Sequence, residues 1–414
     1  MKKLSPEESA ALLERVPAVR EALLANIRPF AQCGGRPLPI AGAAYPGIWL
    51  EHNQDWFFLA DPDLGLDEKA AEAAWAAQEA FLDFQRDDGL FPFCLPLRWN
   101  TPDTCFDAPA LFWQIQAVWS PIRCGLELAR RLGRPEKDLA RLYEAGARYD
   151  AWFRRNRDRA GTGLAEMYCE YDTGHDNDPR VRDGGIPSSC LGRDAAAMPD
   201  IPCMPVLSVD LSAMLFGTRM ALAELADGLG FTADASKWRA DADALGEAMR
   251  RHLYDPEDEF FYDRDTAGLR RYRTEHVTRL FLNGVLEQGE FDRVWKRHFA
   301  VPGQGFSPPF PIPSMAVDDP HFPREATRNC WGRNTQSLTL LRALLWADRY
   351  GRGEWLDGVL AAWLRATLLH ADRFAFQQEL DPLVGEPIGG SPNYTPSLLL
   401  YLAACRRLLP RTPS

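Results

Sequence analysis

The chain has 414 residues, 46% of them hydrophobic, and a formal net charge of −11. A field of that sign repels polyanions, which argues against a nucleic-acid partner. No apolar run approaches the ~20 residues of a membrane helix, and residues 1–16 lack the apolar segment of a secretory signal. We therefore expect a soluble, cytoplasmic protein without a membrane partner. Its nine cysteines show no metal-ligand spacing and are expected to be reduced, mostly buried thiols, with no metal site.

Helical periodicity dominates the chain, and strands with a period of two are scarce. Helices are expected over residues 8–27, 66–86, 109–132, 136–155, 208–229, 233–253, 274–286, 291–297, 334–350, 355–370 and 395–408. Several follow one another closely as pairs, which predicts an all-α fold, either a closed toroid of six helical hairpins or an open solenoid. The pairs share no clear repeat, which favours the toroid. No Ser/Gly-rich or Pro-rich linker divides the chain, so residues 1–414 are expected to form a single domain.

Five long irregular segments separate these helices, at residues 33–63, 90–108, 159–205, 301–333 and 374–394. Long loops in a compact domain usually carry function, and the many aromatic residues here argue against disorder. If the segments gather at one rim of a toroid, they would form a deep, acidic pocket lined by aromatic side chains.

The clearest chemical signal is the turn TGHDNDP at residues 173–179. Its glycine and proline exclude a continuous helix, so its polar side chains lie on a tight turn. Crowding of carboxylates in this region raises the pKa of at least one of them, as a general acid at neutral pH requires. The crowded carboxylates are Glu170, Asp172, Asp176 and Asp178. The alternative is a turn that caps a helix or binds Ca²⁺.

Near the C-terminus, Glu379 lies between an apolar stretch and a turn that contains proline and glycine. Two carboxylates that flank a glycosidic bond can hydrolyse it, because one protonates the leaving oxygen while the other activates water or attacks the anomeric carbon. An ordinary ion pair is the alternative role for Glu379. Trp331 and Arg333 suit a sugar platform with a polar clamp, or else a buried tryptophan and a paired arginine.

Together, these motifs resemble the clan of inverting α-glycosidases that contains glycoside hydrolase family 63 and the family 37 trehalases. The turn at 173–179 matches the family pattern (S/T)G-x-D-(N/D)-(S/D)-P, and residues 379–386 are similar to E-(N/K)-Y-D-P-x-T-G-E. Residues 208–214, 255–263 and 330–333 match further family segments in the same order. The segment 49–57 keeps only part of the family's W-x-W-D-(S/T)-x-F pattern, and Arg333 follows the glycine of its motif where the family has arginine before it.

The resemblance implies an all-α (α/α)6 toroid with its active-site loops at one rim and no cofactor. It also implies an exo-acting, inverting hydrolase of a small α-glucoside or α-mannoside, with Asp176 as general acid and Glu379 as general base. Family 63 includes α-glucosidases and hydrolases of mannosylglycerate and glucosylglycerate. Inversion predicts that the two carboxyl groups lie about 6.5–9.5 Å apart, with room for a water between them.

Aromatic walls and polar contacts are expected around the sugar. The candidate walls are Trp49, Trp56, Trp331 and Phe376, and the candidate polar contacts are Gln54, Asp55, Arg333, Gln336 and Glu386. Glu386 is also the alternative to Glu379 as base. Two other functions stay open. A sugar epimerase or lyase on the same toroid would need a proton-abstracting group, such as His52 or His175, and the other alternative is a catalytically silent carbohydrate-binding protein.

Overall fold

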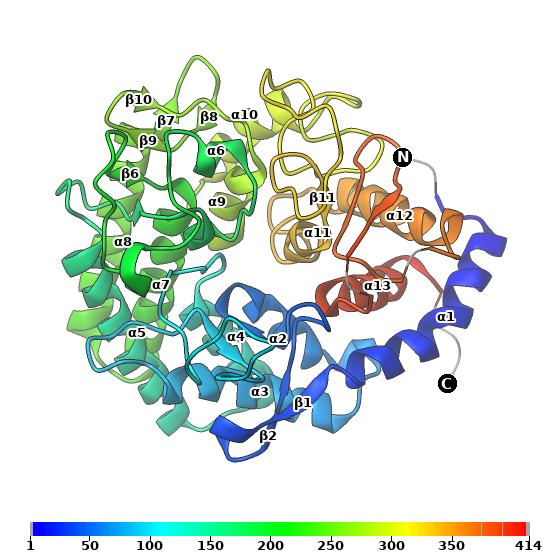
Figure 1. The fold of residues 1–414 in the computed structure, drawn as a ribbon, viewed down its shortest axis with the longest axis horizontal. Helices are drawn as coiled ribbons and strands as arrows, with labels where there is room; N and C mark the ends of the chain where they lie inside the picture. Colours follow the sequence, from blue (N-terminus) through cyan, green and yellow to red (C-terminus); the bar gives the residue numbers. More distant parts are fainter. Residues whose placement is uncertain (1–2, 374, 391, 411–414) are drawn as a thin grey trace.

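The computed structural model describes residues 3–373, 375–390 and 392–410. Along this part of the chain, helices alternate between an outer and an inner position (Figure 1). The outer helices are α1 (Pro6–Leu24), α3 (Glu68–Asp83), α5 (Glu136–Asn156), α8 (Thr232–Leu253), α10 (Gln288–His298) and α12 (Gly353–Leu369). The inner helices are α2 (Asn53–Leu59), α4 (Pro121–Leu132), α7 (Val209–Gly228), α9 (Thr278–Asn283), α11 (Ser337–Ala343) and α13 (Thr395–Leu408).

The inner helices close into a ring. In the described residues, α2 packs against α4, α4 against α7, α7 against α9, α9 against α11, α11 against α13, and α13 against α2 again. Outer helices cover this ring, with α3 on α2, α8 on α7, and α1 and α12 on α13. The closed toroid of helix pairs is therefore confirmed, and the open solenoid is wrong.

Burial follows from this arrangement, because an inner helix has neighbours on both sides. Every residue of α11 is buried, and so is every residue from 395 to 405 in α13. The outer helix α8 is amphipathic and buries mainly small and apolar side chains on one face.

Short antiparallel strands fasten the loops to one another. They pair as β1 (Ile27–Phe30) with β2 (Arg36–Pro39), β3 (Gly47–Trp49) with β4 (Cys94–Pro96), and β7 (Tyr254–Asp255) with β8 (Phe260–Phe261). A four-stranded sheet has the order β10 (Gly268–Leu269), β9 (Arg264–Asp265), β6 (Val206–Leu207), β5 (Glu166–Met167). A three-stranded sheet has the order β11 (Thr335–Gln336), β12 (Glu379–Leu380), β13 (Pro387–Ile388).

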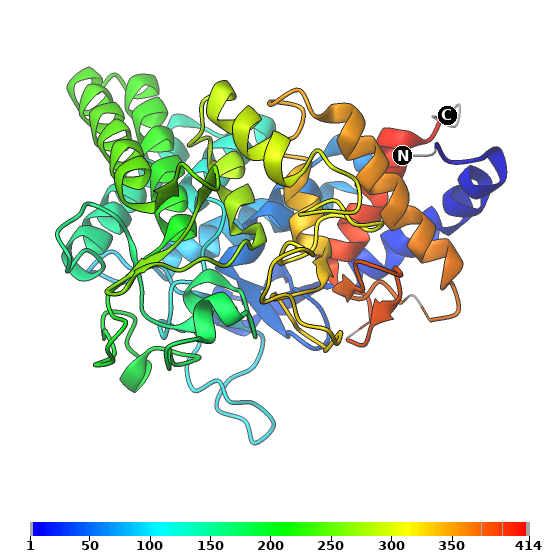
Figure 2. The same ribbon diagram turned by 90° about the horizontal axis from the view of Figure 1, so that it is seen from above.

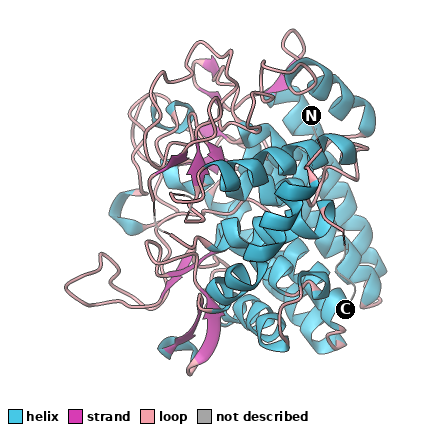
Figure 3. Ribbon diagram, turned by 90° about the vertical axis from the view of Figure 1, so that its right-hand side faces the viewer, coloured by secondary structure: helices cyan, strands magenta, loops and turns pink. Residues whose placement is uncertain are grey.

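The irregular segments gather on one side of the ring, as expected (Figures 2 and 3). Helix α2 was not predicted, because it lies within the expected irregular segment 33–63. Three expected helices are shorter than predicted, since α9 covers only part of 274–286, α11 covers only part of 334–350, and α4 begins only at Pro121 after the irregular residues 109–120. Proline disfavours helical backbone in the residue before it, and the Ser120 side chain caps the helix by accepting from the Arg123 amide at 3.1 Å. Gln116, with φ of 46°, is also incompatible with a helix.

The nine cysteines all lie in the described part of the chain and are free thiols there, with only Cys105 exposed and Cys203 half-buried. Across the same residues, no helix has both the length and the apolar composition needed to cross a bilayer.

Candidate active site

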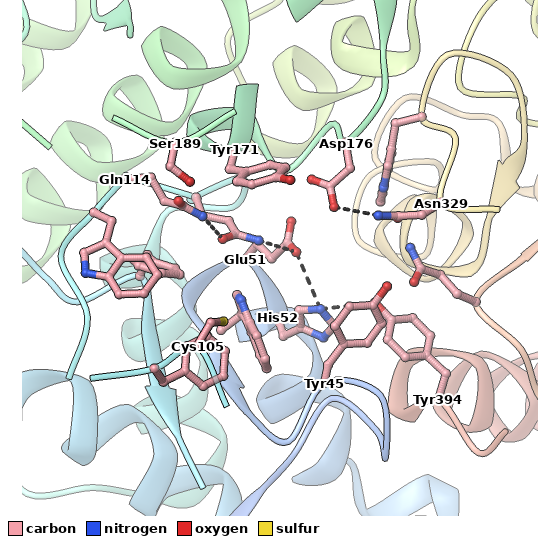
Figure 4. A pocket seen from close by; sticks show the side chains of 18 residues that line it. Tyr45, Glu51, His52, Cys105, Gln114, Tyr171, Asp176, Ser189, Asn329 and Tyr394 are labelled. Carbon is pink, nitrogen blue, oxygen red and sulfur yellow. Dashed lines mark hydrogen bonds and ion pairs between the residues drawn. The ribbon is translucent and has the colours of Figure 1, made fainter. Parts of the chain in front are cut away.

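A cavity of about 270 Å³ lies where the loops meet the first turns of the inner helices (Figure 4). Its position follows from the ring, because the loops that enter α2, α4, α11 and α13 bring side chains to the same place. Its polar lining comes from Glu51, His52, Gln114, Gln116, Asp176, Ser189, Asn329 and Gln378. Its aromatic lining comes from Tyr45, Trp49, Phe93, Phe106, Trp113, Tyr171, Trp331 and Tyr394.

Asp176 reaches the cavity from the turn that the sequence singled out. Gly174 ends a 3-10 turn (Glu170–Thr173) in the left-handed conformation, with φ of 69°. A Cβ at this position would lie 2.1 Å from Oε2 of Glu51, so only glycine fits between the turn and that carboxylate. Helix α6 (Pro179–Arg182) then ends the turn, and the Trp331 amide donates to the Asp176 carbonyl at 3.0 Å.

Burial raises the pKa of Asp176 to about 7. A hydrogen bond from Asn329 opposes this rise, whereas the nearby carboxylates of Glu51, Glu170 and Glu379 add to it. Near neutral pH, a substantial fraction of Asp176 is therefore protonated and can give a proton to a bound group.

Glu379 lies on β12 and is buried, with only 2% of its surface exposed. Its carboxylate accepts from Gln336 Nε2 at 2.8 Å, Asn334 Nδ2 at 3.0 Å and the Cys330 amide at 3.3 Å. Burial raises the pKa of Glu379, and these donors oppose the rise. Glu379 lines a smaller cavity that shares several residues, Asn329 among them, with the main cavity.

Asn329 connects the two carboxylates. Its side-chain Nδ2 donates to Oδ2 of Asp176 at 2.7 Å, and its backbone amide donates to Oε1 of Glu379. It adopts φ of 54°, a left-handed conformation that asparagine tolerates better than most residues. The sequence interpretation missed Asn329, although an asparagine just ahead of the tryptophan motif was visible there.

The other carboxylates near the turn have structural partners. Asp172 forms a fully buried ion pair with Arg157, at 2.5 Å. Asp178 accepts from the Arg180 amide at 2.9 Å and lies against the Arg180 side chain. Of the four carboxylates that are crowded in the sequence, only Asp176 lines the main cavity.

His175, one of the two histidines considered for proton abstraction, lies under the cavity floor. Its Nε2 is 2.7 Å from Glu275, its Nδ1 is 2.8 Å from Arg180, and its ring stacks on Trp331 at 5.1 Å. Burial lowers its pKa well below the usual value for histidine. A neutral histidine that holds Trp331 in place is the role that these contacts support.

The expected substrate contacts divide into two groups. Trp49 and Trp331 line the cavity, and Gln336 contacts Glu379. Six other candidates lie outside the cavity lining that the described residues form; they are Gln54, Asp55, Trp56, Arg333, Phe376 and Glu386.

Each of these six side chains makes contacts with other residues instead of lining the cavity. In α2, Trp56 is 1% exposed and packs on Phe81 at 5.1 Å. Gln54 donates to Asp55 at 3.1 Å, and Asp55 in turn lies 3.0 Å from His52 Nδ1. Arg333 pairs with Asp381 at 2.9 Å, and Phe376 packs on Tyr401 at 5.3 Å. Glu386 is exposed and lies 3.9 Å from Arg373.

Glu51 and His52 line the cavity in place of the expected contacts Gln54 and Asp55. Glu51 Oε1 accepts from Gln116 Nε2 at 3.0 Å, while its buried Oε2 has no hydrogen-bond partner in the part of the chain that the structure describes. His52 Nε2 lies 3.1 Å from the Tyr394 hydroxyl. Figure 4 shows the Glu51 carboxylate directed toward the space beside Asp176 and Tyr171. Their signal in the sequence was a pair of polar residues shortly after Trp49, inside a segment rich in aromatic residues.

One group of potential metal ligands occurs among the described residues, formed by Cys169, Asp172 and Cys190. It is buried, and Arg157 donates to both oxygens of Asp172. The guanidinium therefore supplies the positive charge that this carboxylate needs.

The chain also resembles known proteins. Residues 72–397 match the family described as mannosylglycerate hydrolase MGH1-like glycoside hydrolase domain. Mannosylglycerate hydrolase MGH2 of Selaginella moellendorffii is 28% identical over 185 residues, which cover 42% of this chain and 35% of that protein. A probable trehalase of Eremothecium gossypii is 26% identical over 127 residues, which cover 28% of this chain and 17% of that protein. The aligned parts thus span about a third or less of these relatives.

Solved structures show the same fold. The family 63 mannosylglycerate hydrolase of Thermus thermophilus, in complex with glucose, superposes with a TM-score of 0.69 at 19% identity, covering 93% of this chain and 98% of that one. Neutral trehalase Nth1 of Saccharomyces cerevisiae superposes with a TM-score of 0.62 at 14% identity, covering 90% and 75%. The (α/α)6 fold and the resemblance to the clan are thereby confirmed. The chain belongs to the mannosylglycerate hydrolase MGH1-like family of glycoside hydrolases.

Proposed function

We propose that this protein is an inverting, exo-acting α-glycosidase that hydrolyses a small α-glucoside or α-mannoside. The observation that carries the proposal is the Asn329 bridge, which links Asp176 in the main cavity to Glu379 in the smaller cavity that shares lining residues with it. An asparagine links the two carboxyl groups, and inversion requires that they also leave room for an attacking water. Membership of a glycoside hydrolase family supports the reaction class.

In this mechanism the sugar occupies the buried end of the cavity. Asp176 donates its proton to the glycosidic oxygen as the bond from that oxygen to the anomeric carbon breaks. Glu379 takes a proton from a water on the opposite face, and the water oxygen forms the new bond to the anomeric carbon. The alcohol leaves with the proton of Asp176, and the sugar leaves with inverted configuration.

The cavity favours attack at a chain end. Its floor is closed by buried side chains, Glu51, His52, Gln116 and Tyr394 among them, whereas Cys105 at the other end is exposed. A single terminal sugar fits a site that is closed on one side.

The test is a panel of α-glucosides and α-mannosides that includes trehalose, kojibiose, mannosylglycerate and glucosylglycerate. Proton NMR follows the anomer released, with Asp176→Asn as control. We expect the β-anomer to appear first with at least one substrate, and its release to be lost in the variant. Release of the α-anomer first would contradict inversion, and turnover undiminished in the variant would contradict the role of Asp176.

A sugar epimerase or lyase is the second candidate, and one contact favours it. His52 lines the cavity between Asp55 and the Tyr394 hydroxyl, so a histidine and a tyrosine are both available to move a proton. The same spectra distinguish this reaction, because an epimerised or unsaturated sugar would appear without cleavage by water.

A further inference from the structure

The two ends of the cavity differ in chemistry. The end near Asp176 is polar and mostly buried. The other end is built by Trp49, Phe93, Phe106 and Trp113, which we call the rim cluster. Figure 4 shows Cys105 and Gln114, which accompany this cluster, across the cavity from Asn329.

The rim cluster is a continuous set of rings. Trp49 meets Phe106 at 6.2 Å between ring centroids, Phe106 meets Trp113 at 6.4 Å, and Trp113 meets Phe93 at 5.8 Å. Trp49, Phe106 and Trp113 are only half-buried, so part of their ring surface remains open to the cavity. Open aromatic surface at the accessible end of a pocket suits a ligand group with an apolar face.

Positive charge is scarce around this space. Among the described residues, the lining of the main cavity contains no lysine or arginine, and its one basic side chain, His52, is engaged by Asp55 and Tyr394. Arg193 lies over the Trp113 ring at 4.3 Å but is ion-paired with Asp107. Arg328 lines the smaller cavity beside Glu379.

Negative charge, in contrast, faces the cavity directly. The Glu51 side chain is only 9% exposed, and its Oε2 has no hydrogen-bond partner among the described residues, although its Oε1 accepts from Gln116. A ligand carboxylate placed beside Glu51 would lose its hydration, would gain no guanidinium partner from the described lining of the main cavity, and would face Glu51 and Asp176. A neutral ring would meet neither cost.

We propose that the rim cluster is the aglycone subsite, and that it takes a neutral aglycone with an apolar face, a second sugar ring or an aryl group, in preference to a carboxylate-bearing one such as glycerate. This inference rests on the proposed function, because it assumes that the sugar to be released occupies the polar end.

Binding is measured by isothermal titration calorimetry on full-length Glu379→Gln protein, in which hydrolysis should be slowed about 10³-fold and every side chain that lines the main cavity is kept. The ligands are 4-nitrophenyl α-D-glucoside, kojibiose and glucosylglycerate, with the corresponding mannosides. We expect a neutral ligand to bind at least about tenfold more tightly than the glycerate ligand with the same sugar. The aryl glucoside and kojibiose distinguish an aryl group from a sugar ring.

Two pairs of variants in the same background sharpen the test. Trp113→Ala should weaken the neutral ligands about tenfold, whereas Trp113→Phe should retain most of their affinity. Ser189, half-buried in the lining, offers the opposite change: Ser189→Arg should strengthen glycerate binding in a salt-sensitive way, and Ser189→Gln should not. Circular dichroism verifies that each variant is folded.

Equal or tighter binding of the glycerate ligand to the Glu379→Gln protein would overturn the inference, as would neutral binding that ignores Trp113, or no binding by any ligand. Tight, Trp113-dependent binding without hydrolysis in the unmodified protein would overturn the proposed function and leave the rim subsite standing. Hydrolysis with the same kcat/KM for glycerate and neutral aglycones would overturn the inferred aglycone preference and leave the proposed function standing.

Discussion

Replacing Asp176 by asparagine should remove catalysis and stabilise the fold above neutral pH. Asparagine keeps the size of the side chain and an oxygen that can accept from Asn329 Nδ2, but it cannot donate a catalytic proton or carry a charge. Because the pKa of Asp176 rises from the ordinary 3.8 to about 7 on folding, the folded state holds a proton that the unfolded state releases. Native stability therefore falls as the pH rises from about 4 to 7.

The size of the effect follows from that shift. Each pKa unit corresponds to about 1.4 kcal/mol, so the shift to about 7 gives an upper bound of about 4 kcal/mol above pH 7. Asp176 is partly exposed, and solvent screening reduces the penalty, so we expect about 2–4 kcal/mol. For a chain of 414 residues, the variant should melt about 2–5 °C higher.

Thermal unfolding of both proteins at pH 5 and pH 8 measures this gain, and the NMR assay measures the loss of activity. At pH 5 the penalty has developed less than halfway, so the gain in Tm should be clearly smaller than at pH 8. Asp200→Asn, at an exposed aspartate, is the matched control and should change Tm little at either pH. An Asp176→Asn protein no more stable than the native one at pH 8, or equally stabilised at both pH values, would refute the reasoning.

Three further substitutions test the rest of the site. Glu379→Gln should lower kcat about 10³-fold with little change in KM, since glutamine retains the size and one acceptor oxygen; steady-state kinetics measure both. Asn329→Ala removes a donor that stabilises ionised Asp176, so the pKa of that residue should rise and the alkaline limb of the kcat/KM profile should move to higher pH; an unmoved limb would contradict this. In Gly174→Ala the residue has φ of 69° and its new Cβ would lie 2.1 Å from Oε2 of Glu51. Gly185→Ala is the matched control, because that residue has φ of 80° but its new Cβ would meet no atom within 4 Å. Both should lose about 1–2 kcal/mol of stability in denaturant titrations, and only the former should also lower kcat.

Local patterns in the sequence were enough to predict the main features of the fold and to select Asp176 and Glu379 as candidate catalytic residues. Helical periodicity with scarce strands predicted an all-α fold of paired helices, and the lack of a clear repeat favoured a toroid over a solenoid; the ring of helix contacts confirms the toroid. Glycine and proline around Asp176 predicted a tight turn, which the structure has. The roles of Asp176 and Glu379 remain predictions that the experiments above address.

The contacts of the segment around Trp49 could not be predicted in the same way. The short helix α2 is buried nearly all round, so periodicity does not reveal which of its residues face the ring centre. The expected contacts Gln54, Asp55 and Trp56 lie within the packing, and Glu51 and His52 just before the helix line the cavity.

The sequence by itself determined most of the long helices, the turn that carries Asp176 and the strong acidity of the loops, because each depends on residues that are neighbours in the chain; the short, buried helix α2 was not visible in it. Tertiary structure alone decided which carboxylate of the turn faces the main cavity, since Asp172 is paired with Arg157, Asp178 lies against Arg180, and Asp176 lines the cavity. It also decided the bridge through Asn329, which lies 153 residues from Asp176 and 50 from Glu379. Such contacts exist only once the ring has closed and brought distant loops to one rim.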